Sequence, residues 1–184
     1  MLVGKRAVLA GRRMLNRMPR GLIDVAPPIG ASPWTNVNVT VTANAIQPPL
    51  SSMVAYKVEA TTTGPTRANL TMTGAGRDNG ITVEWFAKQG SAPADCNSFA
   101  VFLGSLLFNM SLNYSTGATS MSAGSGGYAV ALENGWWRVL APIKTGITEG
   151  SSPVIYAGFP GNSETIGKFA YITAPRILAG LLLP

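Results

Sequence analysis

Short stretches in which apolar and polar residues alternate dominate the chain after residue 33, and this period of two constrains the fold more than any other feature. In the clearest stretch, which begins at Trp34, apolar residues at positions 37, 39, 41 and 43 alternate with Asn or Thr at positions 36, 38, 40 and 42. A strand with one buried face requires this alternation, because successive side chains point to opposite faces. We therefore predict a half-buried strand over residues 34–43.

Further strand-like runs follow at short intervals, with no convincing long helix between them. They span residues 54–61, 67–73, 81–88, 98–103, 106–114, 128–132, 136–143, 153–157 and 168–178. About ten strands without intervening helices predict two packed antiparallel sheets rather than a closed barrel. The expected fold class is all-β, a two-sheet antiparallel jelly-roll-like β-sandwich.

The connections have the composition of turns, because Gly, Asn and Asp tolerate positive φ. Asn134-Gly135 is the strongest hairpin signal in the chain, and the Ser/Gly-rich segment 117–127 is expected to be a loop or a flexible hairpin. A chain of 184 residues is long enough for one full-sized domain and a tail. We expect the sandwich to occupy residues 34–184.

The N-terminal segment differs from the sandwich in its charge. Six of the 14 basic residues lie in the first 20 positions with no acid among them, and the rest of the chain is balanced; these six are Lys5, Arg6, Arg12, Arg13, Arg17 and Arg20. Residues 1–33 are therefore expected to form a basic arm, extended or short-helical, followed by a Pro-rich linker. We predict that these six residues anchor the chain electrostatically to an acidic surface of a partner, and rate contact with nucleic acid much lower.

The residue types needed for catalysis are scarce. The chain has no histidine and one cysteine, Cys96, which excludes an internal disulfide and is expected to be a structural thiol. The eight acids are scattered, and although Glu84 and Glu133 could meet in space as a glycosidase dyad, an ordinary strand and turn explain them better. Asp78 and Asn79 could likewise hold calcium, but a hairpin turn explains them more simply. We expect no enzyme activity, no metal site and no cofactor.

Two adjacent tryptophans are the candidate contact residues. Trp136 and Trp137 point to opposite faces if they lie on one strand, so we expect one in the core and the other more exposed. The exposed ring could stack on a sugar or contact a partner protein, although packing against a neighbouring strand is the more frequent outcome.

Several strand motifs, in order, resemble the carbohydrate-binding-like jelly-roll module of bacteriophage tail-fibre, head-fibre and decoration proteins. The matching pieces are residues 34–44, 55–58, 81–88, 133–139 and 169–176, and the most distinctive is Asn134-Gly135-Trp136-Trp137-Arg138-Val139. The resemblance covers residues 34–178 and implies a structural or receptor-contacting role in a virion. Sugar-binding residues vary within this family, so the resemblance transfers none of them to this chain.

Together, the arm and the resemblance predict a bacteriophage virion protein, either a capsid decoration or cement protein or a short head-fibre protein. The alternative is a tail-fibre or receptor-binding adhesin that recognises host polysaccharide. The expected partners are other virion proteins, a host glycan and further copies of this chain. For those copies, the family suggests a trimer.

The apolar C-terminal segment 177–184 is expected to pack on a neighbouring subunit or to close its own core. We expect no membrane-spanning segment.

Overall fold

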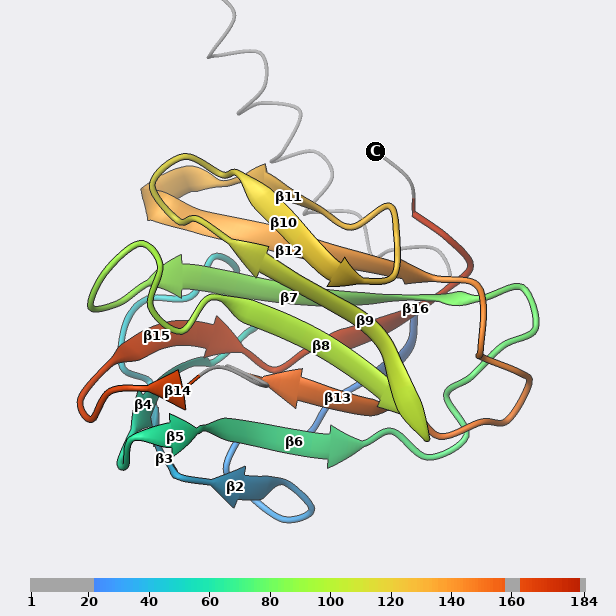
Figure 1. Cartoon of the computed structure of the whole chain (residues 1–184), viewed down its shortest axis with the longest axis horizontal. Helices are drawn as coiled ribbons and strands as arrows, with labels where there is room; N and C mark the ends of the chain where they lie inside the picture. Colours follow the sequence, from blue (N-terminus) through green and yellow to red (C-terminus); the bar gives the residue numbers. More distant parts are fainter. Residues whose placement is uncertain (1–21, 158–162, 183–184) are drawn as a thin grey trace, which may run out of the picture.

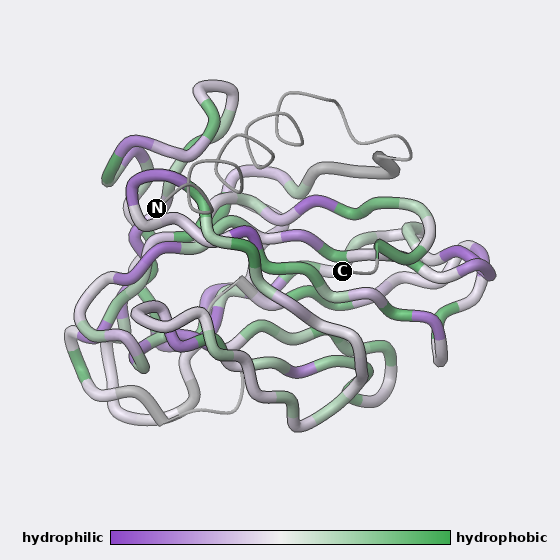
Figure 2. Tube along the Cα trace, turned by 90° about the horizontal axis from the view of Figure 1, so that it is seen from above, coloured by the Kyte–Doolittle hydropathy of each residue, from purple (hydrophilic) through white to green (hydrophobic). Residues whose placement is uncertain are grey.

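The chain folds into a jelly-roll-like β-sandwich of two antiparallel sheets. The structure is a computed structural model that describes residues 22–157 and 163–182. Figure 2 shows the strands in two layers, with hydropathy changing from residue to residue along several of them. The predicted fold class is confirmed.

The first sheet is built around one long central strand. Its eight strands are β1 (Leu22–Val25), β3 (Val39–Ala43), β4 (Ala55–Ala60), β7 (Ile81–Gln89), β11 (Tyr128–Ala131), β12 (Trp136–Ile143), β15 (Phe169–Thr173) and β16 (Arg176–Ala179). The central strand β7 pairs with β12 on one side and with β15 and β16 on the other. Residues 81–87 are buried on both faces, as expected of a strand covered from both sides.

The second sheet has six strands in the order β10-β9-β8-β13-β6-β2. Their bounds are β2 (Thr35–Val37), β6 (Arg67–Thr71), β8 (Ser98–Leu103), β9 (Ser105–Leu112), β10 (Thr119–Ala123) and β13 (Val154–Ala157). In Figure 1, β9, β8, β13, β6 and β2 run one below another in front of the first sheet. A small ladder of β5 (Gly64–Pro65) and β14 (Ser163–Glu164) completes the strands.

Aromatic and aliphatic side chains from both sheets fill the space between them. Trp85 of β7 packs against Phe99 of β8, with 5.6 Å between their ring centroids. The indole nitrogen of Trp85 also donates a hydrogen bond of 3.1 Å to the backbone oxygen of Tyr156 in β13. This buried side chain therefore ties the two sheets together and helps to fix the position of β13.

The predicted strand over residues 34–43 is wrong in one respect, because it is two strands in different sheets. Residues 35–37 form β2 in the second sheet, and residues 39–43 form β3 in the first. Asn38 separates them with a φ of 55°, a left-handed conformation that breaks an extended strand. The predicted strand 168–178 is divided in the same way, into β15 and β16, at Ala174-Pro175.

Two segments for which no strand was predicted contribute one each. Within residues 1–33, expected to be arm and linker, β1 pairs with β16, so the strands begin at Leu22, upstream of the boundary expected at residue 34. The segment 117–127, expected to be a loop or a flexible hairpin, contributes β10, which forms a hairpin with β9. Short edge strands of this kind are stabilised by the neighbour they pair with, which the local sequence does not reveal.

The predicted Asn134-Gly135 hairpin is confirmed. β11 and β12 pair across a short 3-10 turn, η1 (Glu133–Gly135), in which Asn134 and Gly135 adopt φ values of 58° and 74°.

At the C-terminal end of the chain, β16 buries Ile177 and Leu178 within its own sandwich, and the Leu182 N–H donates to Thr82 Oγ1 at 2.9 Å. As far as Leu182, the C-terminal segment therefore closes its own core. No helix in the described ranges has the length and hydropathy to cross a membrane.

Candidate functional site

The predicted anchoring residues cannot be placed. Lys5, Arg6, Arg12, Arg13, Arg17 and Arg20 all lie outside the described residues. Their role in anchoring stays a prediction.

Trp136 and Trp137 point to opposite faces of the first sheet, and packing and hydrogen bonds account for both rings. Trp136 is buried on the face turned away from the sandwich core, where it packs with Ala55 and Phe86, and its indole nitrogen donates to the Gln47 oxygen at 3.2 Å. Trp137 is half-buried against the main core and donates to the Tyr114 oxygen at 3.1 Å. Trp136 is the more buried of the two and offers no open ring face to a ligand. Contact with a sugar or partner by Trp137 stays a prediction.

The two acids considered as a glycosidase dyad lie far apart along the first sheet. Glu84 is fully buried and sits opposite Leu140 on β12. Glu133 precedes the start of β12 at Trp136, roughly 13 Å further along at about 3.3 Å per strand residue. Glu84 instead forms ion pairs with Arg138 and Arg176, so this dyad is excluded.

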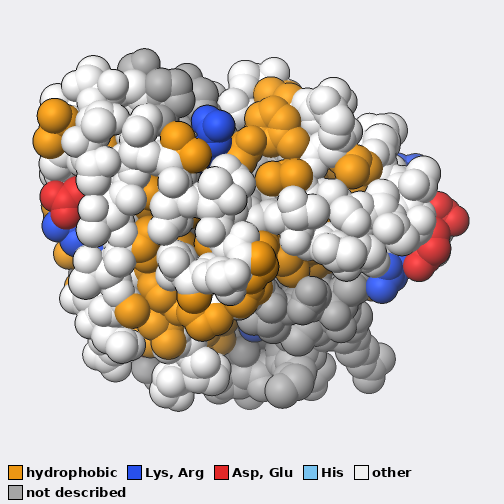
Figure 3. Space-filling model, turned by 90° about the horizontal axis from the view of Figure 1, so that it is seen from below, with side chains coloured by type: hydrophobic (Ala, Val, Ile, Leu, Met, Phe, Trp, Pro, Cys, Tyr) orange, Lys and Arg blue, Asp and Glu red, His pale blue; other side chains and the backbone are white. Residues whose placement is uncertain are grey.

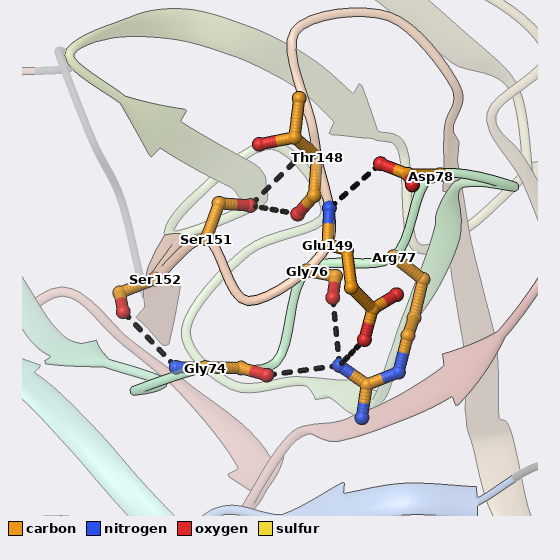
Figure 4. Close-up of polar contacts among 8 residues, drawn as sticks. All are labelled: Gly74, Gly76, Arg77, Asp78, Thr148, Glu149, Ser151 and Ser152. Carbon is orange, nitrogen blue, oxygen red and sulfur yellow. Dashed lines mark hydrogen bonds and ion pairs between the residues drawn. The ribbon is translucent and has the colours of Figure 1, made fainter.

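The Asp78-Asn79 segment is part of a loop that joins the two sheets rather than a hairpin turn. Asp78 Oδ1 accepts a hydrogen bond of 2.8 Å from the Glu149 backbone N–H (Figure 4). Neighbouring Arg77 donates to the Gly74 and Gly76 oxygens at 2.9 and 2.7 Å and lies 3.5 Å from the Glu149 carboxylate. These contacts fasten the β6–β7 loop to the β12–β13 loop. The described part of the chain holds no cluster of three or more His, Cys, Asp or Glu side chains suited to a metal ion.

The outer face of the second sheet, meaning the face turned away from the first sheet, carries a row of side chains suited to binding. Cross-strand pairing places Asn69 of β6, Tyr156 of β13, Ala100 of β8 and Asn109 of β9 side by side. Their strand neighbours Leu70, Ile155, Val101 and Phe108 are buried in the core. Because successive strand residues alternate between faces, the row of Asn69, Tyr156, Ala100 and Asn109 points away from the core, and within it Ala100 is fully buried while the other three are half-buried.

Two aromatic rings and one cation flank this row. Phe102 of β8 meets Tyr156 edge-on, with ring centroids 4.8 Å apart. The guanidinium carbon of Arg67 lies 5.6 Å from the centroid of the Tyr156 ring, within the range of a cation–π contact. All three side chains are half-buried, so each keeps part of its surface accessible. We call Arg67, Asn69, Phe102, Asn109 and Tyr156 the second-sheet cluster.

Part of the polar capacity of the second-sheet cluster is unused. Arg67 Nε and Asn109 Oδ1 are two of three buried side-chain atoms in the described chain with no hydrogen-bond partner. The amide nitrogen of Asn109 is used, since it donates to Ser122 Oγ at 2.9 Å. An unsatisfied buried donor or acceptor costs about 1–3 kcal/mol. Both atoms are buried, so a ligand would satisfy them only when the two side chains turn toward it, and that step would remove this cost.

The first sheet has an aromatic and cationic group of similar composition, but its groups are already engaged. Lys57 lies 4.3 Å from the Phe169 ring centroid, and Phe169 packs edge-on against Tyr171 at 5.5 Å. There the cation has an acidic partner, because Lys57 Nζ is 2.5 Å from the Glu59 carboxylate. Tyr171 also packs against the buried cluster around Trp136. This group therefore holds the fold together, whereas the second-sheet cluster keeps unpaired groups.

The second-sheet cluster was missed in the sequence because its members come from four strands that are distant along the chain. Alternation of Arg67, Asn69 and Thr71 with Ala68 and Leu70 was a usable signal for a polar outer face on β6. Nothing local indicates that β13 lies between β6 and β8, which is what brings Tyr156 beside Asn69.

Comparison with known proteins gave likenesses only among solved structures. No family model matches the chain, and no curated protein matches it. The CBM22-1 xylan-binding domain from Paenibacillus barcinonensis Xyn10C is 19% identical, with a TM-score of 0.48, over 81% of this chain and 87% of that one. The family 11 carbohydrate-binding module from Clostridium thermocellum, solved with a β-1,3-1,4-mixed-linked tetrasaccharide, is 10% identical, with a TM-score of 0.45, over 89% of this chain and 97% of that one.

A third similar structure, a xylan-binding domain from CBM 22, is 14% identical with a TM-score of 0.47, and it covers 89% of this chain and 98% of that one. All three of these solved structures are carbohydrate-binding modules. At these TM-scores and identities the likeness assigns no ligand or function to this chain.

Proposed function

We propose that this chain is a recognition module without catalytic activity, which binds a polysaccharide on the outer face of its second sheet. The observation that carries the proposal is the second-sheet cluster, in which two aromatic rings, two amides and one guanidinium meet on one outward face. The described part of the first sheet has no equivalent group with unused polar atoms.

The chemistry of the second-sheet cluster suits a sugar. The carbon-bound hydrogens on one face of a pyranose ring pack against an aromatic ring, and Tyr156 and Phe102 provide such rings. Sugar hydroxyls both donate and accept hydrogen bonds, and the amides of Asn69 and Asn109 do the same. An extended sheet surface offers several such contacts along a polymer. Figure 3 shows another side of the sandwich, where patches of hydrophobic side chains are visible and charged side chains lie mainly at the rim.

The setting that we propose for this binding is the surface of a bacteriophage particle, on the strength of the strand motifs in the sequence. Of the two virion roles, the second-sheet cluster supports the adhesin that recognises host polysaccharide. The decoration or cement role depends on the basic arm of residues 1–20 and stays a prediction, as do partner virion proteins and a trimer.

The test is affinity electrophoresis of the full chain through gels that contain one polysaccharide each. The panel contains the neutral polymers dextran and xylan, the acidic polymers alginate, hyaluronate and polygalacturonate, a glycerol-phosphate teichoic acid, and extracted bacterial capsules. We expect at least one polymer to retard the chain, and Tyr156→Ala to weaken that binding at least tenfold, because the substitution removes the central ring of the cluster.

Tyr171→Ala is the matched control, since it removes a half-buried tyrosine from the aromatic group of the first sheet. Both variants are first compared with the wild type by thermal unfolding, so that a loss of binding is not a loss of folding. The proposal fails if no polymer retards the chain, or if Tyr156→Ala binds as tightly as Tyr171→Ala.

A further inference from the structure

Arg67 is the only charged residue in the six strands of the second sheet. The sequences of β2, β8, β9, β10 and β13 contain no Lys, Arg, Asp or Glu, and β6 contains Arg67 alone. The outer face of this sheet therefore carries a single positive charge among amides, hydroxyls and aromatic rings. A lone charge on an otherwise neutral face sets the sign of the ligand that the face prefers.

The charge of Arg67 is not neutralised within the described chain. The other arginines there each have a carboxylate partner, since Arg77 lies 3.5 Å from that of Glu149, and Arg138 and Arg176 share that of Glu84. Arg67 forms no ion pair with a described residue, and its Nε atom is buried without an acceptor. Its guanidinium carbon lies over the Tyr156 ring, 5.6 Å from the ring centroid.

A guanidinium binds oxyanions better than it binds neutral oxygens. Its planar fork of N–H donors matches the two oxygens of a carboxylate or phosphate group, and such charge-assisted bonds are shorter and stronger than neutral ones. The guanidinium carbon of Arg67 already lies over the Tyr156 ring, 5.6 Å from its centroid, and this cation–π contact reduces the freedom that Arg67 loses when an anion binds. A carboxylate that meets the guanidinium edge and turns it slightly would also give Nε its missing acceptor.

We infer that the polysaccharide bound by the second-sheet cluster is acidic, and that Arg67 binds its negatively charged group beside a sugar stacked on Tyr156. This inference rests on the function proposed above. A uronic-acid carboxylate and a backbone phosphodiester are two common sources of such a group in polysaccharides, and both present the oxyanion that the guanidinium fits.

The experiment uses the polymer that binds most tightly in the panel, before and after chemical removal of its charge. Carbodiimide activation followed by borohydride converts carboxylates into primary alcohols, and hydrofluoric acid cleaves phosphodiesters. We expect one of these treatments to weaken binding at least tenfold, and which one does so identifies the source of the charge. Binding by the wild type should also weaken as ionic strength rises.

Arg67→Gln keeps hydrogen-bonding groups and removes the charge, so it should weaken binding to the acidic polymer at least tenfold and reduce the salt dependence. Arg67→Lys should restore part of the affinity, because it keeps the charge but lacks the planar fork. Lys57→Gln is the control on the first sheet and should leave the affinity unchanged. Because Arg67 has no ion pair to lose, we expect its variants to unfold at the temperature of the wild type.

The outcomes separate this inference from the proposed function. If the tightest polymer is neutral and depends on Tyr156, polysaccharide binding stands and the preference for acidic sugars is refuted. If an acidic polymer binds but Arg67→Gln binds it equally well, the assignment to Arg67 is refuted. If no polymer binds, the proposed function fails, and the inference fails with it.

Discussion

Among individual side chains in the described part of the chain, Glu84 is a fully buried carboxylate that pairs with two arginines. Its carboxylate is fully buried on the outer face of β7 and is shared by Arg138 from β12 and Arg176 from β16. Arg176 Nε donates to Glu84 Oε2 at 2.6 Å, and its guanidinium also lies over the Phe86 ring at 5.2 Å. One carboxylate therefore holds three adjacent strands of the first sheet in register.

Glu84→Gln should destabilise the fold strongly, by about 3–5 kcal/mol, because it leaves two largely buried guanidiniums without a counter-charge. The measurement is the free energy of unfolding in urea at neutral pH. Glu59→Gln serves as the comparison, since it breaks the half-exposed pair with Lys57 and should cost less than about 1 kcal/mol. Equal losses in the two variants would show that the buried cluster does not stabilise the sheet.

Titration of the Tyr128 hydroxyl should lower the stability of the sandwich at alkaline pH. Burial raises the pKa of its hydroxyl above the usual value of 10.0, the Glu84 carboxylate raises it further, and Arg138 partly opposes both effects. A raised pKa in the folded state means that folding favours the protonated hydroxyl. This contribution is complete below about pH 10 and is lost as pH rises through the folded-state pKa.

Tyr128→Phe removes the group that titrates, so its stability relative to the wild type should improve between pH 8 and pH 11. The measurement is the difference in free energy of unfolding between the two proteins at each pH, which cancels the titration of the other groups. A difference that stays constant over this range would contradict the burial of the Tyr128 hydroxyl.

At the level of strands, Asn38 determines how the chain crosses from one sheet to the other. It separates β2 in the second sheet from β3 in the first, and it adopts a φ of 55°. Asn tolerates this left-handed conformation better than most residues, and a β-branched residue tolerates it poorly. The unbroken alternation across residues 36–42 hides the crossing, so the sequence alone indicates one strand.

Asn38→Val should therefore destabilise the fold by about 1–2 kcal/mol, the usual cost of a left-handed conformation for such a residue. Asn38→Gly should retain more stability, because glycine adopts positive φ readily. Asn36→Val, at an exposed position in β2, is the control and should change stability little. Thermal unfolding ranks the four proteins, and a similar loss in Asn38→Gly and Asn38→Val would rule out the backbone conformation as the cause.

For the whole molecule, the class of fold was predictable from the sequence, and the binding face was not. Alternation and turn residues such as Asn134-Gly135 are local signals, and they identified most of the longer strands correctly. The β10 segment was predicted only as a loop or a flexible hairpin, and β1 was missed because it pairs with β16, which is distant along the chain. The second-sheet cluster depends on such pairing too, since Arg67 and Tyr156 meet only because β6 lies beside β13. The Trp136-Trp137 pair, which the sequence indicated as the candidate contact, lies in the first sheet instead.

The most direct test of the account is to map the bound polysaccharide on the protein by nuclear magnetic resonance. Uniformly 15N-labelled full chain is titrated with oligosaccharide fragments of the tightest-binding acidic polymer, and changes in the backbone and Asn side-chain amide signals are recorded. If the polysaccharide binds the second-sheet cluster, we expect the largest changes in β6, β8, β9 and β13, including the side-chain amides of Asn69 and Asn109. Changes concentrated in the first sheet, or in the basic arm of residues 1–20, would contradict it.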